Sequence, residues 1–260
     1  MKLIGKFLRL VLLAFVVMRI LGQNPKIIQN INSTFEEATQ QFMDDSAQRV
    51  QSSVLEDLGD VPAYTGSPSI TLNGNKPYFI DDGTMYETTT SYEYYAPLDK
   101  LGRCVYAEGN LSTDLMPKND REDISEIRPS GWFNKPYDFI DGGYLYNRCH
   151  LIAFMLTGEN DNEKNLITGT RYFNTEGMLP YEIQVASYIR RTNNHVLYRV
   201  TPVYNGDNLV ADGVVMEAYS VEDNGSGVQF CVYAYNVQPG VTINYKDGDN
   251  YASGYSEGEG

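Results

Sequence analysis

Cysteine and histidine are scarce in this chain of 260 residues, which contains three cysteines and two histidines. The cysteines, at positions 104, 149 and 231, are too few and too widely spaced for a disulfide framework or a zinc knuckle. Export to an oxidising compartment would permit one bridge and leave one thiol over, and the sequence does not indicate which pair. Chemistry that needs an imidazole has only His150 and His195 to draw on.

Basic residues are also few. The first 22 residues carry four of the 20 basic residues and none of the 34 acidic ones, so the rest of the chain has a net charge of −18. Such a surface repels polyanions at long range, so a nucleic-acid substrate would require a basic cleft or a bound cation. The sequence contains no helix-turn-helix, zinc finger or aromatic RNP motif that would read bases.

A long apolar run is found at the N-terminus, in "MKLIGKFLRLVLLAFVVMRILG". Nine apolar residues lie between Arg9 and Arg19, which is the length typical of the apolar region of a signal peptide. A longer anchor is an alternative, because Arg9 could extend its charge to the membrane surface. We therefore expect residues 1–22 to be a signal peptide or a signal anchor, and the protein to be extracellular or anchored at the cell surface.

Three further regions follow. Residues 23–60 are polar with sparse apolar positions, such as Phe42 and Val54, and are predicted to form a helical or flexible stalk. A compact domain is expected over residues 61–246, and an acidic, glycine-rich, flexible tail over 247–260. Asn-Gly at 73–74 and Asp-Gly-Gly at 141–143 are hairpin signals.

The second half of the chain shows clearer periodicity. Apolar residues from Ile183 to Ile189, after Pro180 and before Arg190 and Arg191, predict an amphipathic helix with a cationic C-terminus. "HVLYRVTPVY", "LVADGVVMEAYSV" and "VQFCVYAYNV" each predict a strand.

His150 stands in a polar break between two apolar runs, in "GGYLYNRCHLIAF". A neutral imidazole there could take a proton from water, although a lone histidine is more often structural. Cys149 is adjacent, but neighbouring residues on a strand point to opposite faces and pair poorly. A small, buried, apolar role for Cys149 is favoured over a thiol nucleophile.

Side-chain amides are dense after His150, at positions 160, 162, 165 and 174. Asparagine is common in turns, so each one alone is weak evidence. Asn174 differs because it precedes the predicted helix, where its amide oxygen could bind a hard cation. Glu182, two turns later, could hold a water on that cation.

Taken together, "YNRCHLIAFMLTGENDNEKNLITGTRYFNTEGMLPYE" closely resembles the DNA/RNA non-specific endonucleases of the ββα-metal (His-Me finger) type. The pattern is nearest to secreted streptococcal DNases and DNA-entry nucleases. The family's Asp-Arg-Gly-His motif stands here as Asn147 to His150, and its two spaced asparagines are Asn165 and Asn174. The resemblance extends from about Val61 to Tyr245. It implies an α+β fold with a central antiparallel sheet and flanking helices.

The resemblance also implies roles for individual residues. His150 would be the general base and Asn174 the ligand of one Mg²⁺ or Mn²⁺ ion, with Arg148, Asn165 and Glu182 completing the catalytic set. The substrate would be DNA, with RNA left open, and no obligate protein partner is inferred. Arg103 is a weaker candidate for binding phosphate.

Two positions depart from the family pattern, Asn147 for aspartate and Cys149 for glycine. An amide at 147 could alter the tuning of His150, or could simply hold the loop as aspartate does. These departures and the acidic charge favour an alternative function, a weak or inactive nucleic-acid-binding surface protein that retains the nuclease fold. The retained residues from Arg148 to Glu182 favour an active endonuclease.

Overall fold

The computed structural model describes residues 25–61, 63–80 and 90–253. Residues 1–22, expected to be a signal peptide or anchor, lie outside this part of the chain. None of the described helices is long and apolar enough to cross a membrane.

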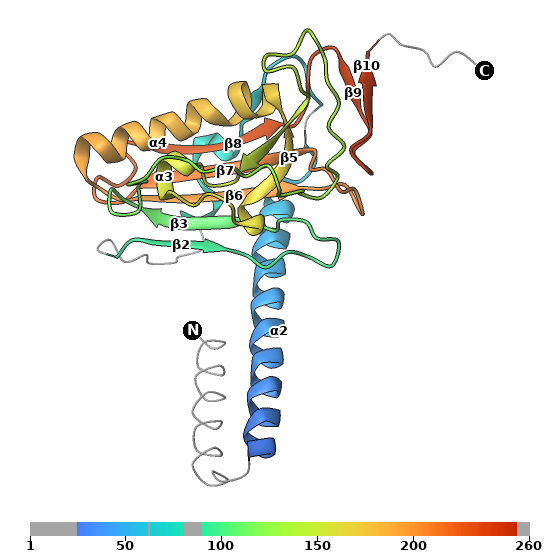
Figure 1. Ribbon diagram of the computed structural model, residues 1–260. Coiled ribbons are helices and arrows are strands. Elements are labelled where there is room, and N and C mark those ends of the chain that lie inside the picture. The colour runs from blue at the N-terminus through green and yellow to red at the C-terminus, as the bar shows by residue number, and fades with distance from the viewer. Residues whose placement is uncertain (1–24, 62, 81–89, 254–260) are drawn as a thin grey trace, which may run out of the picture. The chain divides into compact units, whose positions relative to one another are not determined.

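A six-stranded antiparallel sheet organises the fold (Figure 1). Its strands, in spatial order, are β1 (Ser69–Thr71), β8 (Gln229–Tyr235), β7 (Gly213–Ser220), β6 (Val196–Val203), β3 (Ala107–Leu111) and β2 (Tyr92–Tyr95). The three predicted strands of the second half are confirmed as β6, β7 and β8. All eight residues of β6 are buried, because both faces of the sheet are covered.

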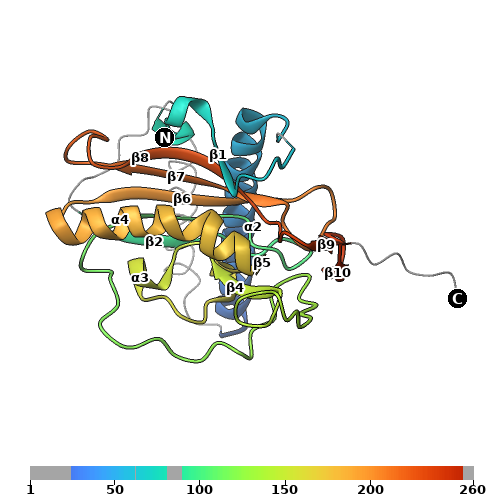
Figure 2. The same cartoon turned by 90° about the horizontal axis from the view of Figure 1, so that it is seen from above.

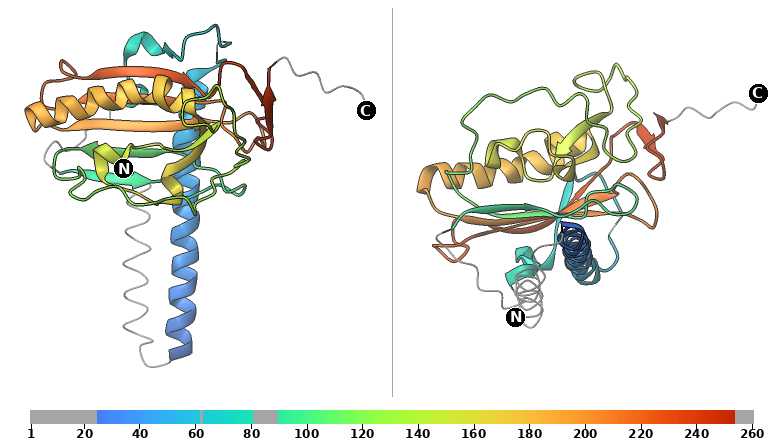
Figure 3. Two further views of the ribbon diagram at one scale, coloured as in Figure 1. Left: turned by 45° about the horizontal axis from the view of Figure 1, so that its top comes forward. Right: turned by 60° about the horizontal axis from the view of Figure 1, so that its bottom comes forward.

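Helix α4 (Leu179–Thr192) covers one face of the sheet (Figure 3). Val185, Ala186 and Ile189 enter the main core, as the apolar pattern predicts, whereas Ile183 is 48% exposed. The helix carries a proline in its first turn and Arg190 and Arg191 in its last, which suits the helix dipole.

Helix α2 (Pro25–Leu58) differs from the expected stalk. The chain divides into two compact units after Ser46, so the last turns of α2 belong to the same unit as the sheet. Ala47 and Val54 are buried, and the Gln51 amide donates to the carbonyls of Val105 and Pro202. The segment is helical, one of the two forms expected of it, and from Ala47 onward its sparse apolar positions nevertheless enter core clusters.

Two smaller sheets complete the strands. β4 (Tyr146–His150) pairs antiparallel with β5 (Leu166–Thr170), and β9 (Val241–Ile243) pairs with β10 (Asn250–Ala252). Strand β10 lies in the region predicted to be a flexible tail. Asn250 is buried there, and its side-chain amide donates hydrogen bonds to the carbonyls of Phe133 and Gly248. Residues 254–260 lie outside the described part.

The two hairpin signals have different outcomes. Asn73, Gly74 and Asn75 do turn with positive φ, but β1 pairs with β8 instead of with the segment after the turn. The turn at Gly142–Gly143 brings Pro136 and Tyr144 together in a single bridge. The turn-forming residues thus predicted where the chain reverses in both places. Which strands pair depended on partners that are distant in the sequence.

The β4–β5 hairpin leads directly to α4. After β5 the chain forms a π-helical turn, Phe173–Met178, in which the Leu179 N–H donates to the Asn174 carbonyl, and α4 continues from it. Gly169 faces Cys149 and Phe173, and a Cβ there would lie 2.5 Å from the Cys149 sulfur. The close approach of strand and π turn therefore requires glycine at 169.

Candidate active site

A cleft of about 440 Å³ opens beside the end of β4. Its walls are formed by β4, the π turn, the first turn of α4, the start of the short helix α3 (Phe154–Thr157) and the loop around residues 121–124. The lining side chains that could take part in chemistry are Arg121, Asn147, Arg148, His150, Arg171, Asn174 and Glu182. Four of the five predicted site residues therefore meet here, namely Arg148, His150, Asn174 and Glu182.

His150 is held in one tautomer. Its Nε2 lies 2.9 Å from the backbone carbonyl of Asn160, and a carbonyl oxygen can only accept, so Nε2 carries the proton. Nδ1 lies 3.4 Å from Nη2 of Arg121, which can only donate, so Nδ1 holds the lone pair. The two contacts agree, and they leave Nδ1 as the basic nitrogen.

Burial, the largest cause, and the positive charge of Arg121 lower the pKa of His150 to about 4, although the hydrogen bond to the Asn160 carbonyl opposes the shift. The ring is 7% exposed, so its charged form is poorly solvated. His150 is consequently neutral at ordinary pH, which is the state that a proton acceptor needs.

Glu182 is a buried carboxyl group on the first turn of α4. It is 6% exposed, and within the described residues it forms neither an ion pair nor a hydrogen bond. Burial raises its pKa to about 8. A buried carboxylate without a partner is costly, so this position suits a group that provides positive charge.

Two amides share the cleft with Glu182. Nδ2 of Asn147 is buried without a hydrogen-bond partner among the described residues, and the side chain of Asn174 makes no hydrogen bond there either. The side-chain oxygens of Asn174 and Glu182 are hard donors of the kind that Mg²⁺ accepts alongside several waters. The residues present therefore fit a divalent cation. The described chain has no cluster of three His, Cys, Asp or Glu residues that would bind a metal alone.

Arg121 and Arg171 were not identified from the sequence. Arg121 reaches His150 from an exposed, charged loop, and Arg171 follows β5 and pairs with Asp141 at 2.7 Å. No local motif distinguishes either arginine from a solvated surface charge, because only the fold brings both into the cleft. Together with Arg148 they give the cleft three cations in a strongly acidic protein.

The model of the DNA/RNA non-specific endonuclease family matches residues 83–222, more than half of the chain. The chain belongs to this family. It is a hydrolytic nuclease, whose substrate is nucleic acid and whose family implies a divalent metal.

Solved structures agree with this assignment. Metal-free NucA from Streptococcus agalactiae is 25% identical, with a TM-score of 0.64 over 80% of this chain and 98% of that chain. The magnesium-bound form of NucA is 23% identical, with a TM-score of 0.65 over 79% and 98%. Sda1 nuclease with bound zinc is 27% identical, with a TM-score of 0.53 over 68% and 88%. These likenesses show the ββα-metal fold. A comparison with curated proteins gave no match.

The guanidinium of Arg148, on β4, is largely occupied by the loop of residues 125–127. Its Nε donates to the Ile127 carbonyl at 2.6 Å and its Nη2 to the Ser125 carbonyl at 2.5 Å. The guanidinium also lies 4.3 Å from the centre of the Trp132 ring. This geometry favours orientation of that loop over direct contact with phosphate as the role of Arg148.

Asn165 lies outside the cleft lining. It is fully buried, and its amide donates to the carbonyl of Ile152 and accepts from the N–H of the same residue. Both ends of the side chain are thereby used to fix the backbone that leaves β4. This geometry favours a positioning role for Asn165 over direct contact with substrate.

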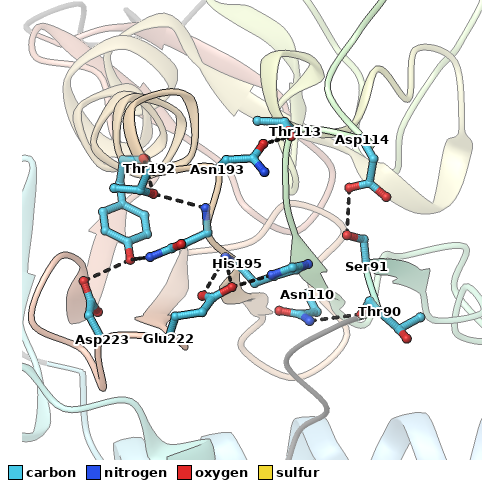
Figure 4. Close-up of polar contacts among 12 residues, drawn as sticks. Thr90, Ser91, Asn110, Thr113, Asp114, Thr192, Asn193, His195, Glu222 and Asp223 are labelled. Carbon is cyan, nitrogen blue, oxygen red and sulfur yellow. Dashed lines mark hydrogen bonds and ion pairs between the residues drawn. The ribbon is translucent and has the colours of Figure 1, made fainter.

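Three other candidates are also accounted for. Arg103 pairs with Asp99 and donates to the carbonyls of Gly206 and Asn208, away from the cleft. His195 follows α4 and bonds to Glu222 through its Nδ1 and its backbone N–H (Figure 4). Cys149 is fully buried in the core, where burial raises the pKa of its thiol, so it is no nucleophile.

Proposed function

We propose that this chain is an exported, metal-dependent endonuclease that hydrolyses DNA, and RNA where it can enter the cleft, with His150 as the general base. The observation that carries the proposal is the fixed tautomer of His150. Its Nε2–H is bound to Asn160, and its basic Nδ1 is in the same cleft as Asn174 and Glu182. The expected membrane or export segment, residues 1–22, supports action outside the cell.

His150 would take a proton from the attacking water at Nδ1. The Asn160 carbonyl stabilises the imidazolium that forms, because it accepts the Nε2–H in both states. The low pKa of His150 keeps the ring free to accept that proton. Departure of the 3′ oxygen would leave a 5′ phosphate on the product.

Asn174 would bind the cation directly, with Asn147 and Glu182 beside it in the cleft. A bound Mg²⁺ or Mn²⁺ ion supplies positive charge that polarises the scissile phosphate and stabilises the leaving oxygen. Arg121 and Arg171 add donors for neighbouring phosphates. Phosphate contacts carry no base information, which agrees with cleavage that is independent of sequence.

A plasmid-nicking assay tests the proposal. Nicking with Mg²⁺ or Mn²⁺ and none in excess EDTA is the expected result. Activity that persists unchanged in EDTA would reject metal dependence. Binding of DNA without nicking under any divalent cation would favour the alternative, an inactive binding protein with the nuclease fold.

A further inference from the structure

Exposed aromatic rings gather on one short stretch of the chain. Phe133, Phe139 and Tyr144 are 52%, 59% and 56% exposed, and they make up half of the six exposed large apolar side chains in the described residues. All three lie on residues 132–144, here called the aromatic segment. Single exposed apolar residues are ordinary, but such a concentration on a soluble domain indicates a binding surface.

The aromatic segment is held by its own contacts. Tyr137 N–H donates to the Gly143 carbonyl, and its ring lies 5.5 Å from that of Phe139. Asn250 on β10 donates to the Phe133 carbonyl, and Tyr137 donates its hydroxyl hydrogen to the Asn250 side chain. Figure 2 shows the loops beside β4 reaching toward β9 and β10. Because the segment is already ordered, binding on it costs little conformational entropy.

The segment is continuous with the cleft through Arg171. The Arg171 N–H donates to the carbonyl of Leu145, directly after the segment, and its guanidinium pairs with Asp141 within the segment. At the other end of the segment, the Trp132 ring lies tilted against that of Tyr146, a cleft residue, with 6.4 Å between the ring centres. The exposed rings therefore lie on a segment that adjoins the cleft at Arg171 and Tyr146.

Charge does not explain what this surface binds. The segment carries one lysine and two aspartates, and the chain beyond residue 22 has a net charge of −18. Stacking on aromatic rings provides about 1–3 kcal/mol per base without any need for positive charge, and it tolerates any sequence. Bases offer their faces only when they are unpaired, because those of a duplex are already stacked on each other.

We propose that the aromatic segment binds unpaired bases of the substrate by stacking, so that the enzyme grips single-stranded nucleic acid more tightly than duplex. The rings of Phe139 and Tyr144 provide the stacking surface beside the cleft. The contacts of Arg171 fix the position of the segment relative to the cleft. This inference rests on the nuclease function proposed above and adds a substrate preference to it.

Binding can be measured without cleavage, by fluorescence anisotropy in EDTA with the full chain carrying His150→Ala. The ligands are a labelled 20-nucleotide oligo-dT and a 20-base-pair duplex. Adding Phe139→Ala and Tyr144→Ala should weaken oligo-dT binding at least about tenfold, since each lost stack is worth about 1–3 kcal/mol. Duplex binding should change by less than twofold. Ile183→Ala, which removes an apolar side chain that is 48% exposed on α4, is the matched control and should change neither.

A second measurement observes the ring itself. The single tryptophan of the chain is Trp132, so Phe139→Trp adds one exposed indole to a known background. Oligo-dT should quench the added fluorescence, the duplex should not, and Phe139→Trp should retain oligo-dT affinity where Phe139→Ala loses it.

Either of two results would overturn the proposal: equal loss of oligo-dT and duplex binding in the alanine variant, or no quenching of the added tryptophan. Cleavage separates this failure from that of the proposed function. A failure of the nuclease proposal would appear in the wild type itself, as the absence of plasmid nicking that depends on a divalent cation.

Discussion

The Nε2–H of His150 donates to the backbone carbonyl of Asn160 across 2.9 Å, and this bond decides which ring nitrogen is basic. Asn165 fixes the backbone after β4 through Ile152, so an asparagine buried away from the cleft helps to set that orientation. The predictions below follow from this arrangement and from the charges around it.

Replacing His150 with alanine should lower DNA cleavage by about 10²–10⁴, the usual cost of removing a general base. The fold should persist, as judged by circular dichroism. His195→Ala is the matched control, because that ring bonds to Glu222 outside the cleft, and it should retain nearly full activity. If added imidazole restores DNA cleavage to His150→Gly, the general-base role is supported. Near wild-type turnover in His150→Ala would exclude that role.

The acidic limb of the pH profile should lie well below the ordinary histidine pKa. A general base works only when deprotonated, and the folded protein holds the pKa of His150 near 4 instead of 6.5. Arg121→Gln removes a nearby positive charge, so the limb should move to higher pH, while burial keeps it below 6.5. The measurement is kcat/KM against pH. Arg190→Gln at the exposed end of α4 should leave the limb in place.

Glu182→Gln should stabilise the metal-free protein at high pH. The folded-state pKa of Glu182 is raised from 4.5 to about 8, so its contribution to stability is full below pH 4.5 and is lost as the pH rises through about 8. Thermal melts in EDTA should therefore show a higher Tm for the variant at pH 9 and similar values at pH 5. Added Mg²⁺ should raise the Tm of the wild type more than that of the variant. Equal gains would show that Glu182 does not support the cation.

Asn147→Asp should strengthen metal binding more than it changes His150. Side chains alternate along β4, so the side chain of residue 147 projects from the same face of the strand as Cys149, and His150 projects from the other face. Residue 147 also lines the cleft together with Asn174 and Glu182. The Mg²⁺ concentration for half-maximal rate should fall, with the acidic limb unchanged. An upward shift of the limb would instead establish the electrostatic tuning of His150 that the family aspartate suggested.

Cys149→Ser should leave activity within about tenfold, because the thiol takes no part in bond making. The side chain is fully buried, so the new hydroxyl should cost about 1–3 kcal/mol of stability by urea denaturation. Cys231→Ser, on the opposite face of the sheet, is a matched control for burying a hydroxyl. Complete loss of turnover in Cys149→Ser alone, with a folded protein, would revive a nucleophilic thiol.

The sequence alone determined the local elements of this protein and the identity of its main candidate residues. Apolar periodicity is a local property, so it sufficed for α4 and for β6 to β8. The spacing from Arg148 to Glu182 likewise identified the family, because the hairpin, π turn and helix that carry the motif are consecutive in the chain.

Only the tertiary structure decided which residues meet and in what state. The base tautomer of His150 depends on the Asn160 carbonyl, and the raised pKa of Glu182 depends on burial that neighbouring segments supply. Arg121 reaches the cleft from a distant loop, and residues 47–58 of α2 gain a core face only because the sheet presents one. Such outcomes are set by contacts between segments far apart in the chain, for which no local pattern encodes a partner.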